Sequence, residues 1–171
     1  MNEEIRIYVA DLAAYNAGHL HGVWIDATDD ISDMWGRIKD MLKTSPVDDA
    51  EEHAVHDYEG FNGYDLHEYE SIEDIHQFAC FIQEHGQLGA ELLNYFCDDL
   101  PQAISALEDN YCGCFKSVAD FAEDLTEQTT EIPKALEYYI DYEAMGRDME
   151  LNRDILTIEL GFEDIHIFWN H

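Results

Sequence analysis

A stretch of 72 residues, Thr44 to Phe115, contains no Lys or Arg but holds 17 Asp and Glu residues. The flanks are acidic but less extreme: residues 1–43 hold 8 acidic and 4 basic residues, and residues 116–171 hold 14 and 4. The formal net charge of the 171-residue chain is −31. Repulsion among like charges destabilises a compact state. The acidic residues therefore indicate a role other than stabilising the fold. A helix in this stretch buries one apolar stripe and turns its acids to water.

The composition is nevertheless that of a folded chain. Apolar residues make up 46% of the sequence and aromatic residues 12%, with only three prolines. An acidic chain that stays disordered lacks the apolar residues needed to offset chain entropy. The length fits one domain, or two or three small ones. We expect no transmembrane helix, since no run of 18 apolar residues occurs. The acidic N-terminus does not read as a signal peptide, and we expect a cytoplasmic protein.

The first third of the chain predicts a compact α+β unit. Short strands are predicted at residues 4–10, 21–27 and 53–58. The first of them alternates, with Ile5, Ile7 and Val9 on one face. A helix capped by Asp29 or Asp30 is predicted to continue to about Lys43.

The middle of the chain is predicted to be helical. Ser71 with an acid three residues later has the pattern of a helix N-cap, and the apolar spacing continues to about His85. A second helix is predicted over residues 88–96. A third helix opens at Asp98-Asp99-Leu100-Pro101, where Pro sits near the first turn. Residues 111–115 break the helical pattern.

The last third predicts further helices and a hairpin. Ser117 is a predicted cap for a helix with Phe121 on its apolar stripe. Thr130 and Pro133 are predicted to open the next helix, with Leu136, Tyr139 and Ile140 facing inward. A further helical turn reaches Met149. The chain then ends in a hairpin with strands at residues 155–160 and 165–169.

No motif predicts catalysis or metal binding. The four cysteines, Cys80, Cys97, Cys112 and Cys114, lack C-x-x-C spacing and are expected to be reduced thiols. None of the histidines form the i, i+4 pair of a zinc-binding helix, and no segment fits a calcium loop. The sequence also lacks the nucleotide-binding and nucleophile motifs of common enzyme classes. We therefore expect no metal, no cofactor and no enzymatic activity.

The charge excludes direct nucleic-acid binding, because neutralising phosphates requires Lys and Arg. The negative charge instead fits a surface that imitates DNA and is bound by DNA-binding proteins. Duplex DNA carries one charge per roughly 1.7 Å of axis, so 31 charges match roughly 50 Å of duplex. Charge alone also fits a solubilising surface. The main alternative function is an acidic adaptor or chaperone that shields a basic DNA-binding protein.

The charge pattern assigns a partner-binding role to 20 carboxylates, most of them in the base-free stretch. They are Asp48, Asp49, Glu51, Glu52, Asp57, Glu59, Asp65, Glu68, Glu70, Glu73, Asp74, Glu84, Glu91, Asp98, Asp99, Glu108, Asp109, Asp120, Glu123 and Asp124.

Three stretches resemble the ArdA antirestriction proteins: residues 7–27 (IYVADLAAYNAGHLHGVWIDA), 56–61 (HDYEGF) and 132–149 (IPKALEYYIDYEAMGRDM). The last is the most specific. Its family-motif residues are Tyr139, Asp141, Tyr142, Arg147 and Asp148. One departure is Met145, where the family usually has an aromatic residue.

The resemblance implies a DNA mimic of mobile genetic elements, which inhibits type I restriction-modification enzymes by occupying their DNA-binding groove. It also implies an elongated α+β chain of three small domains and a homodimer formed through the C-terminal part. On this chain the domains are expected at residues 1–65 (antiparallel sheet with helix), 66–111 (acidic helical bundle) and 112–171 (helices with a β-hairpin). No direct contact with nucleic acid or membrane is expected.

Overall fold

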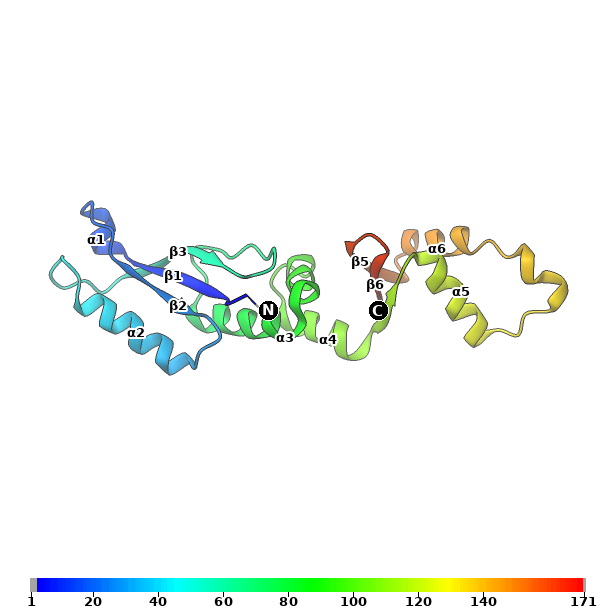
Figure 1. Cartoon of the computed structure of the whole chain (residues 1–171), viewed down its shortest axis with the longest axis horizontal. Helices are drawn as coiled ribbons and strands as arrows, with labels where there is room; N and C mark the ends of the chain where they lie inside the picture. Colours follow the sequence, from blue (N-terminus) through cyan, green and yellow to red (C-terminus); the bar gives the residue numbers. More distant parts are fainter. Residues whose placement is uncertain (1–2, 171) are drawn as a thin grey trace. The chain divides into compact units, whose positions relative to one another are not determined.

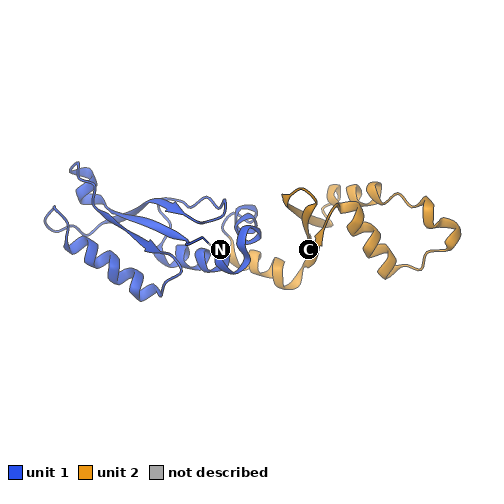
Figure 2. Cartoon of the chain, viewed as in Figure 1, with its two compact units in different colours: residues 1–98 blue, residues 99–171 orange. Residues whose placement is uncertain are grey.

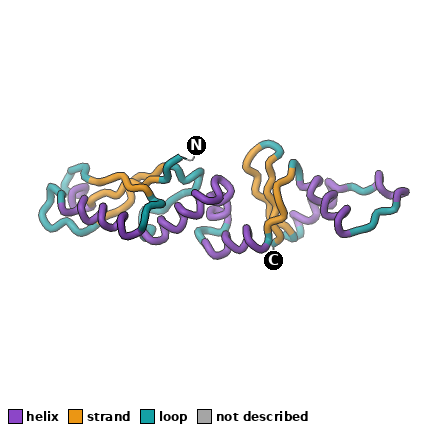
Figure 3. The backbone as a smooth tube through the Cα atoms, turned by 60° about the horizontal axis from the view of Figure 1, so that its bottom comes forward, coloured by secondary structure: helices purple, strands orange, loops and turns teal. Residues whose placement is uncertain are grey.

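The computed structural model describes residues 3–170 and divides into two compact units, Met1–Asp98 and Asp99–His171 (Figure 2). Within the described residues, helices combine with two three-stranded antiparallel sheets, whose strands are orange in Figure 3. This confirms the predicted mixture of α and β structure. The division into three domains stays a prediction.

In the first unit, residues 3–98 form a sheet and three helices (Figure 1). In chain order its elements are β1 (Arg6–Asp11), α1 (Leu12–Asn16), β2 (Gly22–Asp26), α2 (Ile31–Lys43), β3 (His53–Glu59) and α3 (Ile72–Tyr95). The three predicted strands and the helix between the second and third are confirmed. The short helix α1 was not predicted.

The sheet of the first unit has the order β2-β1-β3, so the alternating strand β1 is central. Ile7 and Val9 on β1 have no exposed surface. Helix α2 covers the sheet with its apolar stripe, in which Met34, Ile38 and Met41 are buried. Asp30 is the residue that caps α2, and its carboxylate accepts a hydrogen bond from the Ser32 amide at 2.9 Å. The periodicity of 2 in the strand and 3.6 in the helix therefore places the core as expected.

Helix α3 contacts α2 and the segments that follow β2 and β3 through aromatic and polar side chains. Tyr64 is 1% exposed, and its ring lies 5.6 Å from that of Phe78 on α3. His76 Nδ1 lies 3.0 Å from the carbonyl oxygen of Ala27. The indole of Trp35 on α2 donates to Glu73 at 2.9 Å. These contacts explain why the sheet and α3 form one unit.

Gly86 breaks α3 where two separate helices are predicted. Its φ of 62° and ψ of −144° lie in a region that is essentially restricted to glycine. A Cβ atom there would meet nothing within 4 Å. Backbone conformation, and not lack of space, therefore requires glycine at this position.

We expect Gly86→Ala to destabilise the protein by about 1–3 kcal/mol, the usual cost of a residue held in such a region. The matched control is Gly36→Ala in α2, which also has open space around the added Cβ. Because Gly36 lies inside a regular helix, its replacement should stabilise by roughly 0.5–1 kcal/mol. Urea denaturation followed by circular dichroism measures both. Equal effects of the two substitutions would contradict this account of Gly86.

In the second unit, residues 99–170 form four helical segments and the second sheet. In chain order its elements are α4 (Leu100–Asp109), β4 (Tyr111–Phe115), α5 (Val118–Thr129), the 3-10 helix η1 (Lys134–Tyr139), α6 (Tyr142–Leu151), β5 (Ile155–Gly161) and β6 (Asp164–Trp169). The terminal hairpin is confirmed. The sheet order is β4-β6-β5, and one core cluster joins Phe121 of α5 to Ile155 and Ile167.

Strand β4 lies where the sequence shows only a break in the helical pattern. It pairs antiparallel with β6, about fifty residues later in the chain, and the register shifts between Tyr111 and Gly113. Gly113 has a φ of 125°. An irregular strand with a left-handed residue has no regular alternation, and its partner is remote in sequence.

The segment after α5 differs from the prediction. Thr130 is the C-terminal flanking residue of α5 and does not cap a new helix, and Pro133 precedes a 3-10 helix. Leu136 and Tyr139 are 55% and 83% exposed, so the prediction that they face inward is wrong. In a short 3-10 helix, residues three apart share a face, and no other part of residues 3–170 covers that face.

Candidate partner-binding surface

The carboxylates assigned to partner binding lie at the surface. Among these 20 residues, Glu70, Glu91, Asp98 and Asp99 are partly buried and the other sixteen are exposed. Among all the acidic residues in the described part of the chain, Asp11 alone is buried. The fold therefore turns almost the whole acidic content of the sequence toward solvent.

The assigned carboxylates come from loops, a strand and helices of both units. In the first unit, four of them precede β3 (Asp48, Asp49, Glu51 and Glu52), two lie on β3 (Asp57 and Glu59) and three follow it (Asp65, Glu68 and Glu70). Four more lie on α3 (Glu73, Asp74, Glu84 and Glu91), and the last residue of the unit is Asp98. In the second unit, Asp99 precedes α4, Glu108 and Asp109 end α4, and Asp120, Glu123 and Asp124 lie on α5.

Few of these charges are neutralised. Residues 1–98 hold 22 acidic and 4 basic residues, and residues 99–171 hold 17 and 4. Within residues 3–170, Arg6 is the one Arg or Lys in an ion pair; it contacts Glu59 and lies 3.8 Å from Glu4. Both units therefore carry an uncompensated negative surface, and such a surface attracts basic partners and accelerates their association.

Some of the assigned carboxylates also support the fold. Asp99 caps α4 by accepting from the Gln102 amide at 3.1 Å. Asp98 accepts from the Tyr64 hydroxyl at 2.7 Å, and burial together with this carboxylate raises the pKa of Tyr64 far above its ordinary value. A substitution at Asp98 or Asp99 therefore tests stability together with binding.

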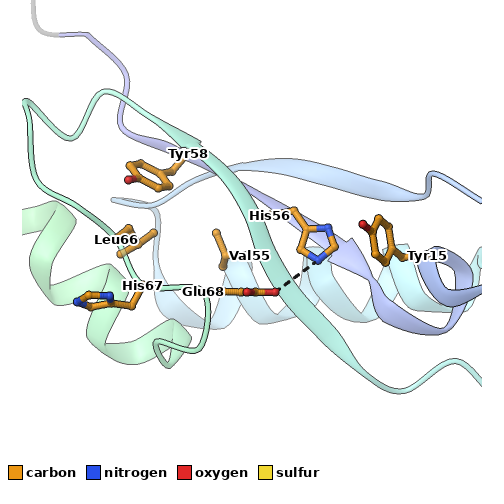
Figure 4. Close-up of a pocket in the computed structure, with 7 residues that line it drawn as sticks. All are labelled: Tyr15, Val55, His56, Tyr58, Leu66, His67 and Glu68. Atoms are coloured by element: carbon orange, nitrogen blue, oxygen red, sulfur yellow. Dashed lines mark ion pairs between the residues drawn. The ribbon is translucent and has the colours of Figure 1, made fainter.

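An open hollow of about 410 Å³ lies beside β3 in the first unit (Figure 4). Its lining residues are Tyr15, Val55, His56, Tyr58, Leu66, His67 and Glu68. The imidazole of His56 lies 4.0 Å from the Glu68 carboxylate, and the Tyr15 ring meets it edge-on at 4.8 Å. The hollow brings assigned Glu68 to the 56–61 stretch, but it presents no nucleophile held against a base.

A second hollow, of about 440 Å³, lies in the second unit and is strongly acidic. We call it the glutamate hollow; it is lined by Glu123, Glu127, Thr130, Glu131, Ile132, Glu137, Tyr138 and Tyr142. Desolvation and the neighbouring carboxylates raise the pKa of Tyr142. Carboxylates combined with aromatic rings suit the guanidinium or ammonium group of a basic side chain.

The glutamate hollow joins an assigned carboxylate, Glu123, to a family-motif residue, Tyr142. Glu127, Glu131 and Glu137 were not among the predicted site residues. The spacing of four from Glu123 to Glu127 was an available signal, because both lie on α5 and residues four apart share a helix face. Glu131 and Glu137 lie beyond the end of α5, and this spacing does not mark them.

The other family-motif residues are not brought together in this hollow. Asp141 caps α6, accepting from the Ala144 amide at 2.9 Å, so its role is explained by helix formation. Tyr139, Arg147 and Asp148 are exposed. Met145, at the departure from the family pattern, has its sulfur 3.3 Å from the Thr126 hydroxyl and so joins α6 to α5.

A protein-family model described as "Antirestriction protein (ArdA)" matches residues 7–164. The chain belongs to the ArdA antirestriction protein family. The match confirms the resemblance drawn from the three stretches and extends it through the acidic middle. A comparison with curated protein sequences gave no significant match.

Membership in the ArdA family implies an antirestriction function, with a restriction enzyme as the partner. The family name is that of an inhibitor and names no reaction catalysed by the protein itself. Among residues 3–170, the ArdA chain has no helix both long and apolar enough to cross a membrane.

Proposed function

We propose that this ArdA protein is a DNA mimic that inhibits type I restriction-modification enzymes by occupying their DNA-binding groove. The observation that carries the proposal is the exposure of the assigned carboxylates without compensating cations. In a basic groove, these carboxylates stand in for phosphate oxygens and accept charge-assisted hydrogen bonds from Arg and Lys. The inhibitor acts by charge and shape and needs no bond chemistry, cofactor or metal.

The glutamate hollow supports a docking role for the second unit. A groove that binds DNA presents Arg and Lys side chains to phosphates, and such a side chain fits an acidic hollow with Tyr138 and Tyr142 in its wall. The remaining carboxylates are spread over both units, so we infer that the binding energy is shared among many weak contacts. An exposed ion pair contributes roughly 0.2–1 kcal/mol.

The proposal is tested by direct binding. Full-length protein is titrated onto an immobilised, purified type I restriction-modification complex at increasing salt concentrations. Because the contacts are between charges at the surface, we expect affinity to fall steeply with salt. Affinity that does not change between about 0.05 and 0.5 M salt would contradict a charge-based inhibitor. Binding that leaves DNA cleavage unimpaired would instead support the adaptor or chaperone reading.

We further propose that the protein forms a homodimer through its second unit, where exposed apolar side chains support a contact between copies. Leu136, Tyr139 and Leu151 are 55%, 83% and 72% exposed. Apolar surface of this kind gains free energy when a second protein covers it. A dimer also doubles the number of charges presented to the groove.

The dimer proposal predicts that Leu136→Ser combined with Tyr139→Ser yields a monomer, since both changes remove apolar contact area. A loss of roughly 3 kcal/mol of contact free energy corresponds to a dissociation constant more than a hundredfold higher. Sedimentation velocity measures the change. Tyr69→Ser in the first unit, at a residue 89% exposed, is the control and should leave the dimer intact. A double variant that stays dimeric would contradict the proposed interface.

A further inference from the structure

Three side chains with metal-binding groups meet on one face of the second sheet. Cys114 on β4 and His166 on β6 are directly paired across the strands. Asp164 precedes His166 by two residues, so it projects from the same face of β6. That face is opposite the one on which Ile165 and Ile167 pack against Phe121. The strand register, and not a flexible loop, therefore places the three groups together.

The three groups converge on one point. The Cys114 thiol donates to Asp164 Oδ1 at 3.0 Å, and His166 Nε2 lies 3.1 Å from the same oxygen. The ligand atoms of the three residues all lie within 4.8 Å of one another. In tetrahedral zinc sites the metal binds sulfur at about 2.3 Å and nitrogen or oxygen at about 2.0–2.2 Å. Ligand atoms bound to one such ion lie less than 4.8 Å from one another, as the three ligand atoms do here.

A fourth residue orients the imidazole. The Tyr111 hydroxyl lies 2.6 Å from His166 Nδ1, and the two rings are stacked at 5.8 Å with an interplanar angle of 18°. With Nδ1 engaged by tyrosine, Nε2 is held toward Cys114 and Asp164. A metal-binding histidine usually donates its second ring N–H to an outer partner, which fixes the orientation of the ring, and the Tyr111 oxygen is placed to accept it.

The donor types favour a transition-metal ion over other uses of the cluster. Mg²⁺ and Ca²⁺ prefer sites built from oxygen ligands, whereas thiolate with imidazole suits Zn²⁺ and Co²⁺. A nucleophilic cysteine would need its thiol hydrogen-bonded to a base such as imidazole. Here the thiol donates to Asp164, whose carboxylate is a weaker base than imidazole, and the imidazole approaches that same oxygen. We propose that Cys114, Asp164 and His166 form a binding site for one Zn²⁺-like ion, with a fourth coordination position open.

The test uses Co²⁺ as a spectroscopic probe of the full-length, reduced protein, with Mg²⁺ in large excess to occupy the general acidic surface. Thiolate coordination gives a near-ultraviolet charge-transfer band that carboxylates alone do not give. We expect one Co²⁺ per chain with this band, and its loss when one equivalent of Zn²⁺ is added. Cys114→Ser should abolish the band, while Asp164→Asn and His166→Gln should weaken Co²⁺ binding at least tenfold.

Two further variants test whether the band and the Co²⁺ affinity come from this site. Cys97→Ser removes another exposed cysteine, located in the first unit, and should leave the band unchanged. Tyr111→Phe keeps all three ligands and should weaken Co²⁺ binding roughly tenfold, the low end for loss of an outer partner. Circular dichroism checks folding of each variant. Absence of the band, its persistence in Cys114→Ser, or its loss in Cys97→Ser would overturn the proposal.

Discussion

Neutralising four exposed carboxylates before and after β3 is expected to weaken inhibition of a type I restriction-modification enzyme strongly. The variant combines Asp48→Asn, Glu51→Gln, Glu52→Gln and Asp65→Asn, which keep side-chain size and remove four charges. At roughly 0.2–1 kcal/mol for each exposed pair, inhibition should weaken by roughly fourfold to nearly a thousandfold. Each single change should cost less than about fivefold. DNA cleavage in the presence of increasing inhibitor measures these effects.

The matched control removes four other exposed charges, with Asp40→Asn, Asp154→Asn, Glu159→Gln and Glu163→Gln. These residues are exposed but lie outside the assigned group. We expect the control variant to inhibit within about threefold of the parent, since long-range attraction is screened beyond about 8–10 Å. An equal loss in both quadruple variants would show that total charge matters and placement does not. A single substitution that abolished inhibition in a folded protein would contradict shared binding energy.

Removing the charge of the glutamate hollow is also expected to weaken inhibition of the type I restriction-modification enzyme strongly. Glu123→Gln, Glu127→Gln and Glu137→Gln together leave a hollow of the same shape with fewer charges. A hydrogen bond to a charged group contributes roughly 1.5–3 kcal/mol, so loss of one docked basic side chain should weaken inhibition by about ten- to a hundredfold. The inhibition assay above measures this change.

Tyr142→Phe is the companion variant for the hollow. It keeps the ring and removes the hydroxyl, so it should inhibit almost as well as the parent if the ring face contacts a cation. Thermal unfolding of both variants shows whether the helices α5 and α6 remain packed. If the triple variant is folded and inhibits as well as the parent, the glutamate hollow is not part of the binding surface.

The sequence predicted the parts of the fold that depend on local pattern. Alternation of Ile5, Ile7 and Val9 predicted the central strand, and the cap at Ser71 marks the start of α3, where its hydroxyl accepts from the Asp74 amide at 3.1 Å. The irregular strand β4 was missed because its pairing with β6 depends on residues far along the chain. The inward orientation of Tyr139 was wrong because its segment forms a 3-10 helix that the rest of the chain does not cover.

The candidate surfaces were predictable to different degrees. Excess charge alone places carboxylates such as Glu51 and Glu108 at the surface, because a lone charge is expensive to bury. The glutamate hollow is lined by residues of α5, η1 and α6, and the spacing of residues does not specify that arrangement. The cluster of Cys114, Asp164 and His166 was not predicted because fifty residues separate Cys114 from Asp164, whereas the known metal-binding motifs have short spacings.

Competition with DNA tests the central claim most directly. A purified type I restriction-modification complex is bound to labelled duplex DNA, and full-length protein is added in increasing amounts. DNA mimicry predicts displacement at near-stoichiometric protein, weakening as salt rises. Retention of the labelled DNA at low salt, with protein in large excess, would contradict the proposal and favour an adaptor that binds outside the groove.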